Sequence, residues 1–175
     1  MAAIYKVKVQ WGDCDGARIV FYPNFFRWFD EAARNLFEAH GLPWAEMFDR
    51  YGTRGLPLVD ARATFRRPAR FGDTLEIRTR VLRWGSRSLD LAHDVANAGA
   101  AAVEGRETRI WGVTDPRDPE GLKAGDIPAE IKALIPAEQA RVVQLLVARI
   151  TVSEAGLAID LRHDGLGAIA ALMAR

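Results

Sequence analysis

Two aspartates, Asp13 and Asp15, stand two residues apart in the segment WGDCDGARIVFYPN at positions 11–24. An alternating strand pattern ends just before this segment and a long amphipathic helix begins at its end, so the aspartates lie in a turn that leads into a helix. A helix N-terminus presents free N–H groups and a partial positive charge. A carboxylate beside such donors could attack a carbonyl, or activate water against it, while the donors hold the developing oxyanion. The arrangement suits acyl transfer.

Two other interpretations of the Asp13–Asp15 pair stay open on local grounds. Aspartate is common in turns and helix caps, where it does no chemistry. A D-x-D-G sequence after a strand also resembles the nucleophile loop of haloacid-dehalogenase-type phosphatases. In those enzymes the strand is a central, apolar one, whereas Lys6, Lys8 and Gln10 give this strand a polar face. The phosphatase interpretation is therefore the less favoured of the two.

Other reactive side chains give weaker signals. Cys14 lies between two acids that disfavour its thiolate, so we expect it to be buried rather than nucleophilic. The three histidines, His40, His93 and His163, have a spacing that fits neither a zinc site nor a catalytic triad. The sequence therefore predicts neither a metal nor a cofactor.

The composition is that of an ordinary globular protein. The chain has 175 residues and a net charge of +1, enough length for one domain with a sizeable core and too little charge to indicate nucleic-acid binding. A single cysteine excludes an internal disulfide, and no apolar run is long enough for a membrane span or a signal peptide. We therefore expect a cytoplasmic protein that binds neither nucleic acid nor membranes. A group of arginines at 62, 66, 67 and 70 could bind phosphates.

The hydropathy pattern predicts a strand, a long helix and then a four-stranded meander. Alternation over residues 4–11 predicts a strand with Trp11 on its buried side. Residues 23–40 form a broad apolar stripe typical of an amphipathic helix, and a short helix is expected at 43–51. Four strands and a final loop follow, at 56–65, 74–84, 86–96, 101–114 and 115–128 respectively. This order predicts an α+β domain in which one antiparallel sheet wraps around one long helix.

The chain is predicted to divide at residue 135. Residues 1–135 form the α+β domain, and residues 136–175 form a C-terminal extension. The pattern of the extension predicts an amphipathic helix at 138–148, a hairpin at 149–161 and a short apolar helix at 164–175. It is too small to hold a core alone, so its role stays open.

The segments GDCD at 12–15, IVFYPNF at 19–25 and RWFD at 27–30 closely resemble the 4-hydroxybenzoyl-CoA thioesterase family of hotdog-fold proteins. The match continues in order through RN at 34–35, GLP at 41–43, Gly55, Pro57 and GD at 72–73. It covers residues 4–135 and leaves out the C-terminal extension. The resemblance implies a hotdog fold, homodimers that pair into tetramers, and acyl-CoA bound between subunits.

The resemblance also implies roles for single residues. Asp15 matches the catalytic carboxylate, which acts as nucleophile or as general base. Tyr22 matches the residue at the helix start whose backbone N–H polarises the thioester carbonyl. Asp30 matches an acid that helps to line the aryl pocket. Arg87 and Ser88 match a corner that contacts the phosphates of CoA.

Three positions depart from the family pattern. The family turn Asp-Pro-Ala-Gly becomes Asp-Gly-Ala-Arg at 15–18, so Arg18 is expected to narrow the site or to bring a charge to the substrate. The corner before Arg87 lacks two arginines of a close relative, so phosphate contacts are expected to pass partly to Arg66, Arg67 or Arg70. Leu56 replaces a pocket threonine, which favours an acyl group less polar than 4-hydroxybenzoyl.

Together these features predict an acyl-CoA thioesterase that acts on an aromatic, benzoyl- or 4-hydroxybenzoyl-like acyl group as a homodimer or homotetramer. One alternative is a hotdog module that binds acyl-CoA but is not catalytic, because the altered turn at 15–18 has abolished catalysis. The other is a phosphohydrolase built on Asp13 and Asp15. Turnover separates enzyme from binding module, and magnesium dependence separates the phosphohydrolase from both.

Overall fold

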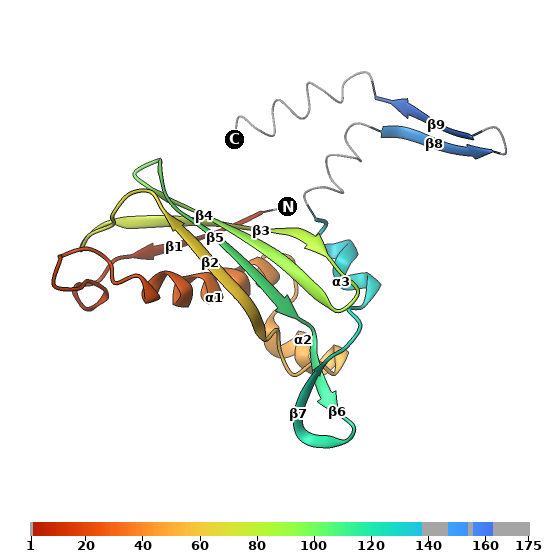
Figure 1. The fold of residues 1–175 in the computed structure, drawn as a ribbon, viewed down its shortest axis with the longest axis horizontal. Coiled ribbons are helices and arrows are strands. Elements are labelled where there is room, and N and C mark those ends of the chain that lie inside the picture. The colour runs from red at the N-terminus through yellow and green to blue at the C-terminus, as the bar shows by residue number, and fades with distance from the viewer. Residues whose placement is uncertain (1, 138–146, 154–155, 163–175) are drawn as a thin grey trace.

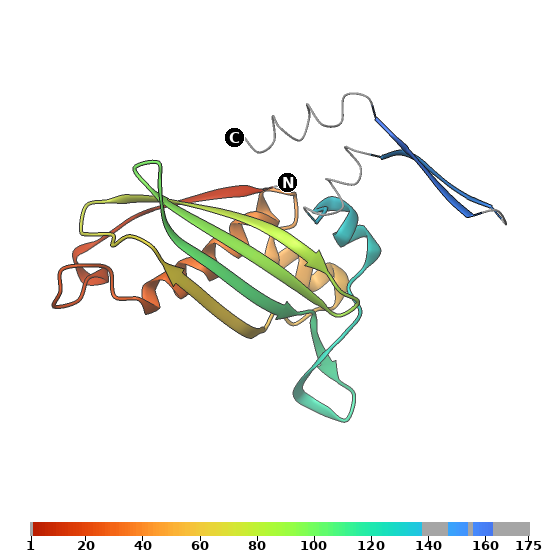
Figure 2. The same cartoon turned by 45° about the horizontal axis from the view of Figure 1, so that its top comes forward.

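The main body of the protein is one curved sheet that wraps around one helix, as predicted. The computed structural model describes residues 2–137, 147–153 and 156–162 (Figure 1). The sheet is antiparallel, with strand order β1-β3-β4-β5-β2. Its strands are β1 (Ala3–Lys8), β2 (Leu58–Phe65), β3 (Thr74–Trp84), β4 (Ser88–Asn97) and β5 (Ala100–Ile110). Helix α1 (Pro23–Glu38) runs along one face of this sheet (Figure 2).

Helix α1 is strongly amphipathic. It begins at Pro23, where the missing N–H of proline costs no helical hydrogen bond. Its buried face is rich in aromatic side chains that fill the concave side of the sheet, namely Phe25, Trp28, Phe29 and Phe37, with Leu36. On the exposed face Arg34 forms ion pairs with Glu31 and Glu38, one turn away on either side. The helix is therefore held by burial on one side and by local pairs on the other.

The centre of the helix packs very closely on the sheet. The ring of Phe29 stacks on His93 of β4, with centroids 4.7 Å apart and planes 12° from parallel. Gly105 of β5 lies beneath the same ring, and a Cβ at this position would lie 2.6 Å from two Phe29 carbons. The glycine is therefore required by the close approach of helix and sheet.

Replacing Gly105 by alanine is expected to lower the free energy of unfolding by about 1–3 kcal/mol, because the added methyl group overpacks the core against Phe29. Urea denaturation measures this change. The matched control is Gly12→Ala, where a new Cβ meets nothing within 4 Å and the unfolding midpoint should not fall. An unchanged midpoint for Gly105→Ala would contradict the packing argument.

One prediction about β1 is wrong. Trp11 was expected on the buried side of the strand, but its side chain is 76% exposed. The strand ends at Lys8, and residues Trp11–Asp13 form a short 3-10 turn that breaks the alternation. Trp11 instead packs edge-on against Phe71, with ring centroids 5.7 Å apart.

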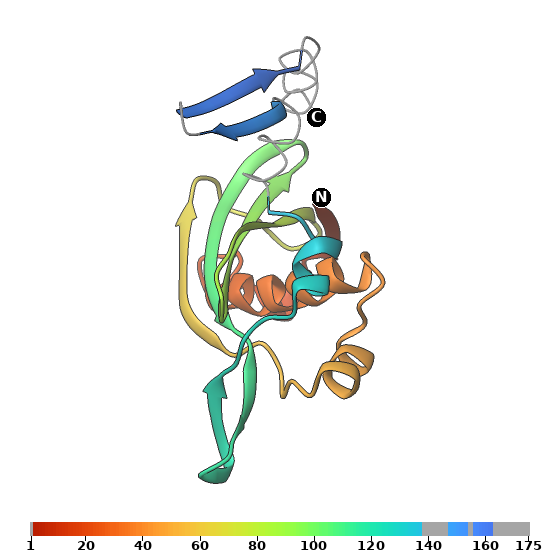
Figure 3. The same cartoon turned by 90° about the vertical axis from the view of Figure 1, so that its right-hand side faces the viewer.

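The predicted strand at 101–114 and the loop after it are also corrected. Strand β5 ends at Ile110, and a separate strand, β6 (Gly112–Asp115), pairs with β7 (Asp118–Ala124), which lies in the predicted loop. At Gly112 the chain passes from the main sheet into the β6–β7 hairpin, and the Gly112 N–H donates to the Gly55 carbonyl at 3.0 Å. The β6–β7 hairpin projects away from the main sheet (Figure 3).

Two further helices complete the main body. Helix α2 (Trp44–Tyr51) follows α1 as predicted, and α3 (Ala129–Leu134) was not predicted. The indole of Trp84, at the end of β3, donates to the Ile135 carbonyl just after α3, at 2.7 Å. No helix within the described ranges is long and apolar enough to cross a membrane.

The predicted hairpin in the C-terminal extension is confirmed. Strands β8 (Val147–Ser153) and β9 (Gly156–Leu161) form a two-stranded antiparallel sheet. The helix predicted at 138–148 lies outside the described residues except for its last two positions, which belong to β8. The helix predicted at 164–175 lies wholly outside them. The boundary at residue 135 stays a prediction.

Candidate active site

The turn that carries Asp15 is closed by its own hydrogen bonds. The Asp15 N–H donates to the Ile19 carbonyl and the Arg18 N–H donates to the Asp15 carbonyl, each at 2.9 Å. The Ala17 N–H donates to Asp15 Oδ1 at 2.8 Å. Arg18 adopts φ = 60°, in the left-handed region that glycine enters without steric cost. Arg18, which departs from the glycine of the family pattern, therefore places a Cβ in a left-handed backbone conformation.

The two aspartates of the turn have different surroundings. Asp13 is 8% exposed, and its carboxylate accepts hydrogen bonds from the Gln10 N–H and from Arg27, both at 2.8 Å. Its backbone carbonyl accepts from the Phe21 N–H at 2.8 Å, so Asp13 holds the turn together. Asp15 is exposed, and its Oδ2 accepts no hydrogen bond from the described part of the chain. Asp15 is therefore the carboxylate that is available for chemistry.

Asp15 and Tyr22 line one pocket of about 500 Å³. The other residues around it come from the turn, the start of α1 and the end of β2: Ile19, Val20, Phe25, Phe65, Arg66, Arg67, Pro68 and Ala69. Tyr22 is the cap residue that immediately precedes α1. Its backbone N–H has no acceptor among the residues that the structure describes, as expected for the first turn of a helix. The pocket thus combines a carboxylate, an unpaired N–H and an apolar wall.

The arginines proposed for phosphate binding are in different states. Arg66 forms a two-pronged pair with Glu104 at 2.8 and 3.2 Å, and the hydrogen bond from Arg66 lowers the pKa of that carboxyl group. Arg67 lines the Asp15 pocket, and within the described ranges its guanidinium has no ion-pair partner. Arg62 and Arg70 are exposed and lie outside the lining of this pocket, as does Arg18, which was expected to narrow the site or to bring a charge to the substrate. Of the arginines at 62, 66, 67 and 70, Arg67 is the best placed to meet an anion.

Asp30 and Leu56 line a second pocket, of about 480 Å³. The remaining residues of its wall are Phe26, Trp44, Phe48, Arg54, Gly55, Pro57, Leu58, Glu107 and Arg109. This pocket lies at the beginning of β2, whereas the Asp15 pocket lies at its end. The 8 residues of β2 span about 23 Å at roughly 3.3 Å per residue. Within one chain the predicted site residues are therefore divided between two separate places.

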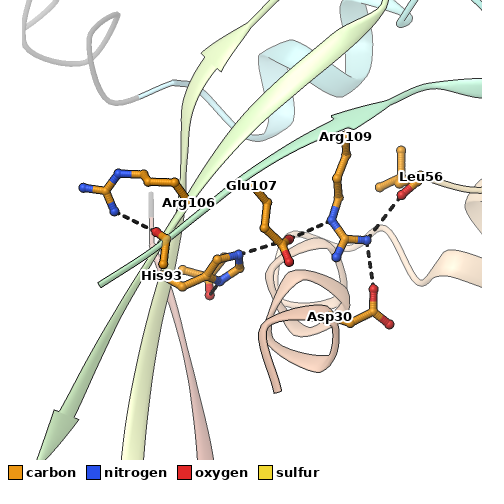
Figure 4. A network of polar contacts seen from close by, with 8 residues as sticks. Asp30, Leu56, His93, Arg106, Glu107 and Arg109 are labelled. Atoms are coloured by element: carbon orange, nitrogen blue, oxygen red, sulfur yellow. Dashed lines mark hydrogen bonds and ion pairs between the residues drawn. The ribbon is translucent and has the colours of Figure 1, made fainter. Parts of the chain in front are cut away.

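The second pocket is backed by buried charges that the sequence analysis missed. Arg109 and Glu107 of β5 are 3% and 2% exposed, and Arg109 Nε donates to Glu107 Oε2 at 2.9 Å. The same guanidinium forms an ion pair with Asp30 Oδ1 at 2.9 Å and donates to the Leu56 carbonyl at 3.3 Å (Figure 4). His93 completes the cluster, with Nε2 3.3 Å from Glu107 Oε2.

The protonation states of the cluster follow from its contacts. Burial raises the pKa of Glu107, but hydrogen bonds from His93 and Arg109 outweigh burial, and the pKa lies below its ordinary value. An ionised carboxylate only accepts hydrogen bonds, so His93 Nε2 is the donor to Glu107, and His93 Nδ1 lies 2.9 Å from the Thr79 hydroxyl. The alternating burial pattern along β5 could have predicted that both charged side chains are buried, because Glu107 and Arg109 lie on the same face of the strand as the buried Val103.

Arg87 and Ser88 lie at the corner that joins β3 to β4. Arg87 forms an ion pair with Asp126 at 3.1 Å, and both side chains are largely exposed. Neither residue lines either of the two pockets described above. Their contact with CoA phosphates stays a prediction.

The comparisons with known proteins assign the family. The family model described as the thioesterase-like superfamily matches residues 9–135. The chain is 33% identical over 129 residues to 4-hydroxybenzoyl-CoA thioesterase from Pseudomonas sp. strain CBS-3. The aligned region covers 70% of this chain and 89% of that protein. The chain belongs to the 4-hydroxybenzoyl-CoA thioesterase family. This result confirms the predicted family membership. It also confirms the prediction that the protein is a thioester hydrolase.

Solved structures of family members have the same fold. The structure of the Pseudomonas enzyme aligns with a TM-score of 0.71 at 32% identity, over 76% of this chain and 98% of that chain. A gentisyl-coenzyme A thioesterase aligns with a TM-score of 0.65 at 32% identity, over 76% and 98%. The predicted hotdog fold is confirmed. A 1,4-dihydroxy-2-naphthoyl-CoA hydrolase of Prochlorococcus marinus is 32% identical over 79 residues, 43% of this chain and 53% of that protein.

Proposed function

We propose that this protein is an aryl-CoA thioesterase in which Asp15 is the nucleophile or general base. The observation that supports the proposal is that Asp15, which has a free carboxylate oxygen, and Tyr22, which has an unpaired backbone N–H, line the same pocket at the start of α1. The three relatives named above are thioesterases or hydrolases of aromatic CoA thioesters by name, which supports an aromatic acyl group.

The chemistry needs only these groups and water. As nucleophile, Asp15 attacks the thioester carbonyl, the C–S bond breaks, CoA leaves as thiolate, and water hydrolyses the resulting anhydride. As general base, Asp15 takes a proton from the attacking water, and collapse of the tetrahedral intermediate expels the same thiolate. In both routes the Tyr22 N–H stabilises the oxyanion on the carbonyl oxygen.

The division of the site supports a homodimer with a shared active site. Strand β2 is at the edge of the sheet and exposes Leu58, Val59 and Phe65, a combination that favours pairing with another strand. An antiparallel pairing of two β2 strands about a two-fold axis brings the end of one against the beginning of the other. The Asp15 pocket of one subunit would then meet the Asp30 pocket of its partner. A tetramer stays a prediction.

In this arrangement the acyl ring enters the pocket of Asp30 and Leu56, and the thioester carbonyl lies against Asp15 and Tyr22. Arg67 lies beside the thioester end and is proposed to hold a phosphate of CoA, since a guanidinium binds phosphate through paired hydrogen bonds. Arg87 and Ser88 are proposed to contribute from the corner between β3 and β4, with Arg18 as a further cation near the turn.

Thiol release from a panel of acyl-CoAs tests the proposal. With a metal chelator present, we expect release from benzoyl-, 4-hydroxybenzoyl- and phenylacetyl-CoA at rates well above those for acetyl- and hexanoyl-CoA, because the walls of the second pocket are largely aromatic and aliphatic. Tight binding without release from any thioester would contradict the enzyme and indicate a binding module. Magnesium-dependent release of phosphate from phosphate esters, without thiol release, would indicate the phosphohydrolase.

A further inference from the structure

One backbone carbonyl joins the carboxylate turn to the start of α1. The carbonyl oxygen of Asp13 accepts from two donors at once, the Phe21 N–H at 2.8 Å and Nδ2 of Asn24 at 2.9 Å. Both donors belong to the helix side of the site, since Phe21 directly precedes the cap residue Tyr22 and Asn24 lies in the first turn of α1. The acceptor lies two residues before Asp15. This carbonyl therefore links the two parts of the chain that the proposed chemistry uses.

The orientation of the Asn24 amide follows from its surroundings. A backbone carbonyl can only accept a hydrogen bond, so the amide group that faces the Asp13 carbonyl is the NH₂ group. The amide oxygen is 3.5 Å from Nη2 of Arg27, which also donates to Asp13 Oδ1 at 2.8 Å. Asn24 is half-buried, so water competes only in part for the bond to the carbonyl. The donor is therefore held in place from both ends of the amide.

Asn24 and Arg27 hold different parts of the turn. Arg27 binds the side chain of Asp13, whereas Asn24 binds the main chain, and the main chain is what carries Asp15. Nucleophilic and general-base catalysis both require the carboxylate to lie in a fixed place relative to the thioester carbonyl and its oxyanion donor. A misplacement of about 1 Å can lower the rate by about a hundredfold. A side chain that fixes this main chain therefore affects the reaction without touching the substrate.

We propose that Asn24 is a positioning residue of the thioesterase, whose side-chain amide fixes the main chain of the carboxylate turn against the start of α1 and so sets the place of the Asp15 carboxylate relative to the Tyr22 N–H. This inference rests on the proposed aryl-CoA thioesterase function. Asn24 does not line the Asp15 pocket, so it acts through the turn and not on the substrate. An aspartate of the same shape could not replace it, because a carboxylate would face the carbonyl with an acceptor in place of the donor.

The test compares Asn24→Ala and the isosteric Asn24→Asp with the wild type. For each protein, kcat is measured for thiol release from benzoyl-CoA, and Kd is measured by calorimetry for phenacyl-CoA, a thioether that cannot be hydrolysed. We expect kcat to fall by about ten- to a hundredfold in Asn24→Ala and further in Asn24→Asp, while Kd changes by less than about threefold, because the walls of the pockets are kept. A Kd that weakens in proportion to the loss of kcat would indicate general damage and would overturn the proposal.

Asn97→Ala is the matched control. Nδ2 of Asn97 donates to Asp73 Oδ2 at 2.7 Å, and Asn97 is half-buried like Asn24 but lines neither pocket. Losing this bond should lower the urea midpoint of unfolding at least as much as losing that of Asn24, because its acceptor is charged, yet kcat should stay within about twofold of wild type. A loss of kcat in Asn24→Ala no larger than that in Asn97→Ala would contradict the positioning role.

A double variant shows whether Asn24 acts through Asp15. Once the carboxylate is gone, its placement no longer matters, so Asp15→Asn combined with Asn24→Ala should release thiol within about threefold of the rate of Asp15→Asn alone. A double variant that is slower than Asp15→Asn by the full factor measured for Asn24→Ala would mean that the two residues act independently, and this result would overturn the proposal.

Failure of the inference and failure of the proposed function give different results. Absence of thiol release by the wild type from any acyl-CoA would overturn the enzyme, and the positioning role with it. Thiol release by the wild type that Asn24→Ala and Asn24→Asp retain in full would support the enzyme and overturn the positioning role alone. Thiol release that falls in both variants, with Kd for phenacyl-CoA kept, would support both.

Discussion

Replacing Asp15 by asparagine lowers the kcat of thiol release from the preferred aryl-CoA by about a hundredfold to ten-thousandfold, because an amide can neither attack the thioester nor accept a proton from water. Asparagine keeps a carbonyl oxygen where Oδ1 accepts from the Ala17 N–H at 2.8 Å, so the turn should survive. Steady-state kinetics with a chelator present measures the effect, and circular dichroism checks the fold. The variant should still bind the substrate, since the pocket loses no atoms.

Asp13→Asn is the matched control for Asp15→Asn. Asp13 is buried and bonded to Arg27 and to the Gln10 N–H, so this variant should lose stability rather than chemistry. We expect a lower free energy of unfolding, with kcat of the folded protein within tenfold of wild type. If Asp15→Asn kept more than a tenth of wild-type activity, the catalytic role of Asp15 would be contradicted. If Asp13→Asn were folded but inactive, the catalytic role would pass to Asp13.

Two inactive variants restore activity when their subunits are mixed. Asp15→Asn removes the catalytic carboxylate, and Asp30→Trp fills the acyl pocket from an exposed position on α1. If each active site takes Asp15 from one subunit and Asp30 from the other, half of the dimers in an equal mixture are mixed, and each mixed dimer contains one intact site. The mixture should therefore recover roughly a quarter of wild-type activity. Refolding the two variants together and measuring thiol release tests this.

Two controls make the complementation informative. A mixture of Asp15→Asn with Asp15→Ala should stay inactive, because no combination of these subunits restores the carboxylate. Size-exclusion chromatography of differently tagged subunits shows whether mixed dimers form. Mixed dimers without recovered activity would place both aspartates in one subunit's site and would contradict the shared site proposed from the edge position of β2.

The sequence by itself determined the elements of this protein and the location of its acidic turn. Strand β3 was predicted at 74–84, as observed, and α1 was predicted to within two residues at its end. Amphipathic periodicity, Pro23 at the helix start and the motif at 19–25 are local signals, formed by residues that are neighbours along the chain. Local signals also placed Asp15 between a strand and a helix, which is why its surroundings could be anticipated.

Only the tertiary structure decided which charged groups meet. Arg27, 14 positions further along the chain, pairs with Asp13 and not with Asp15, and Arg109 of β5 pairs with Asp30 of α1. The carbonyl of Leu56 also accepts from the buried Arg109, a contact between residues 53 positions apart. The sequence contains these charges but not their partners, because an ion pair between β5 and α1 depends on strand order and on the curvature of the sheet around the helix. For the same reason the separation of Asp15 from Asp30 along β2, and with it the case for a shared site, emerges only from the folded chain.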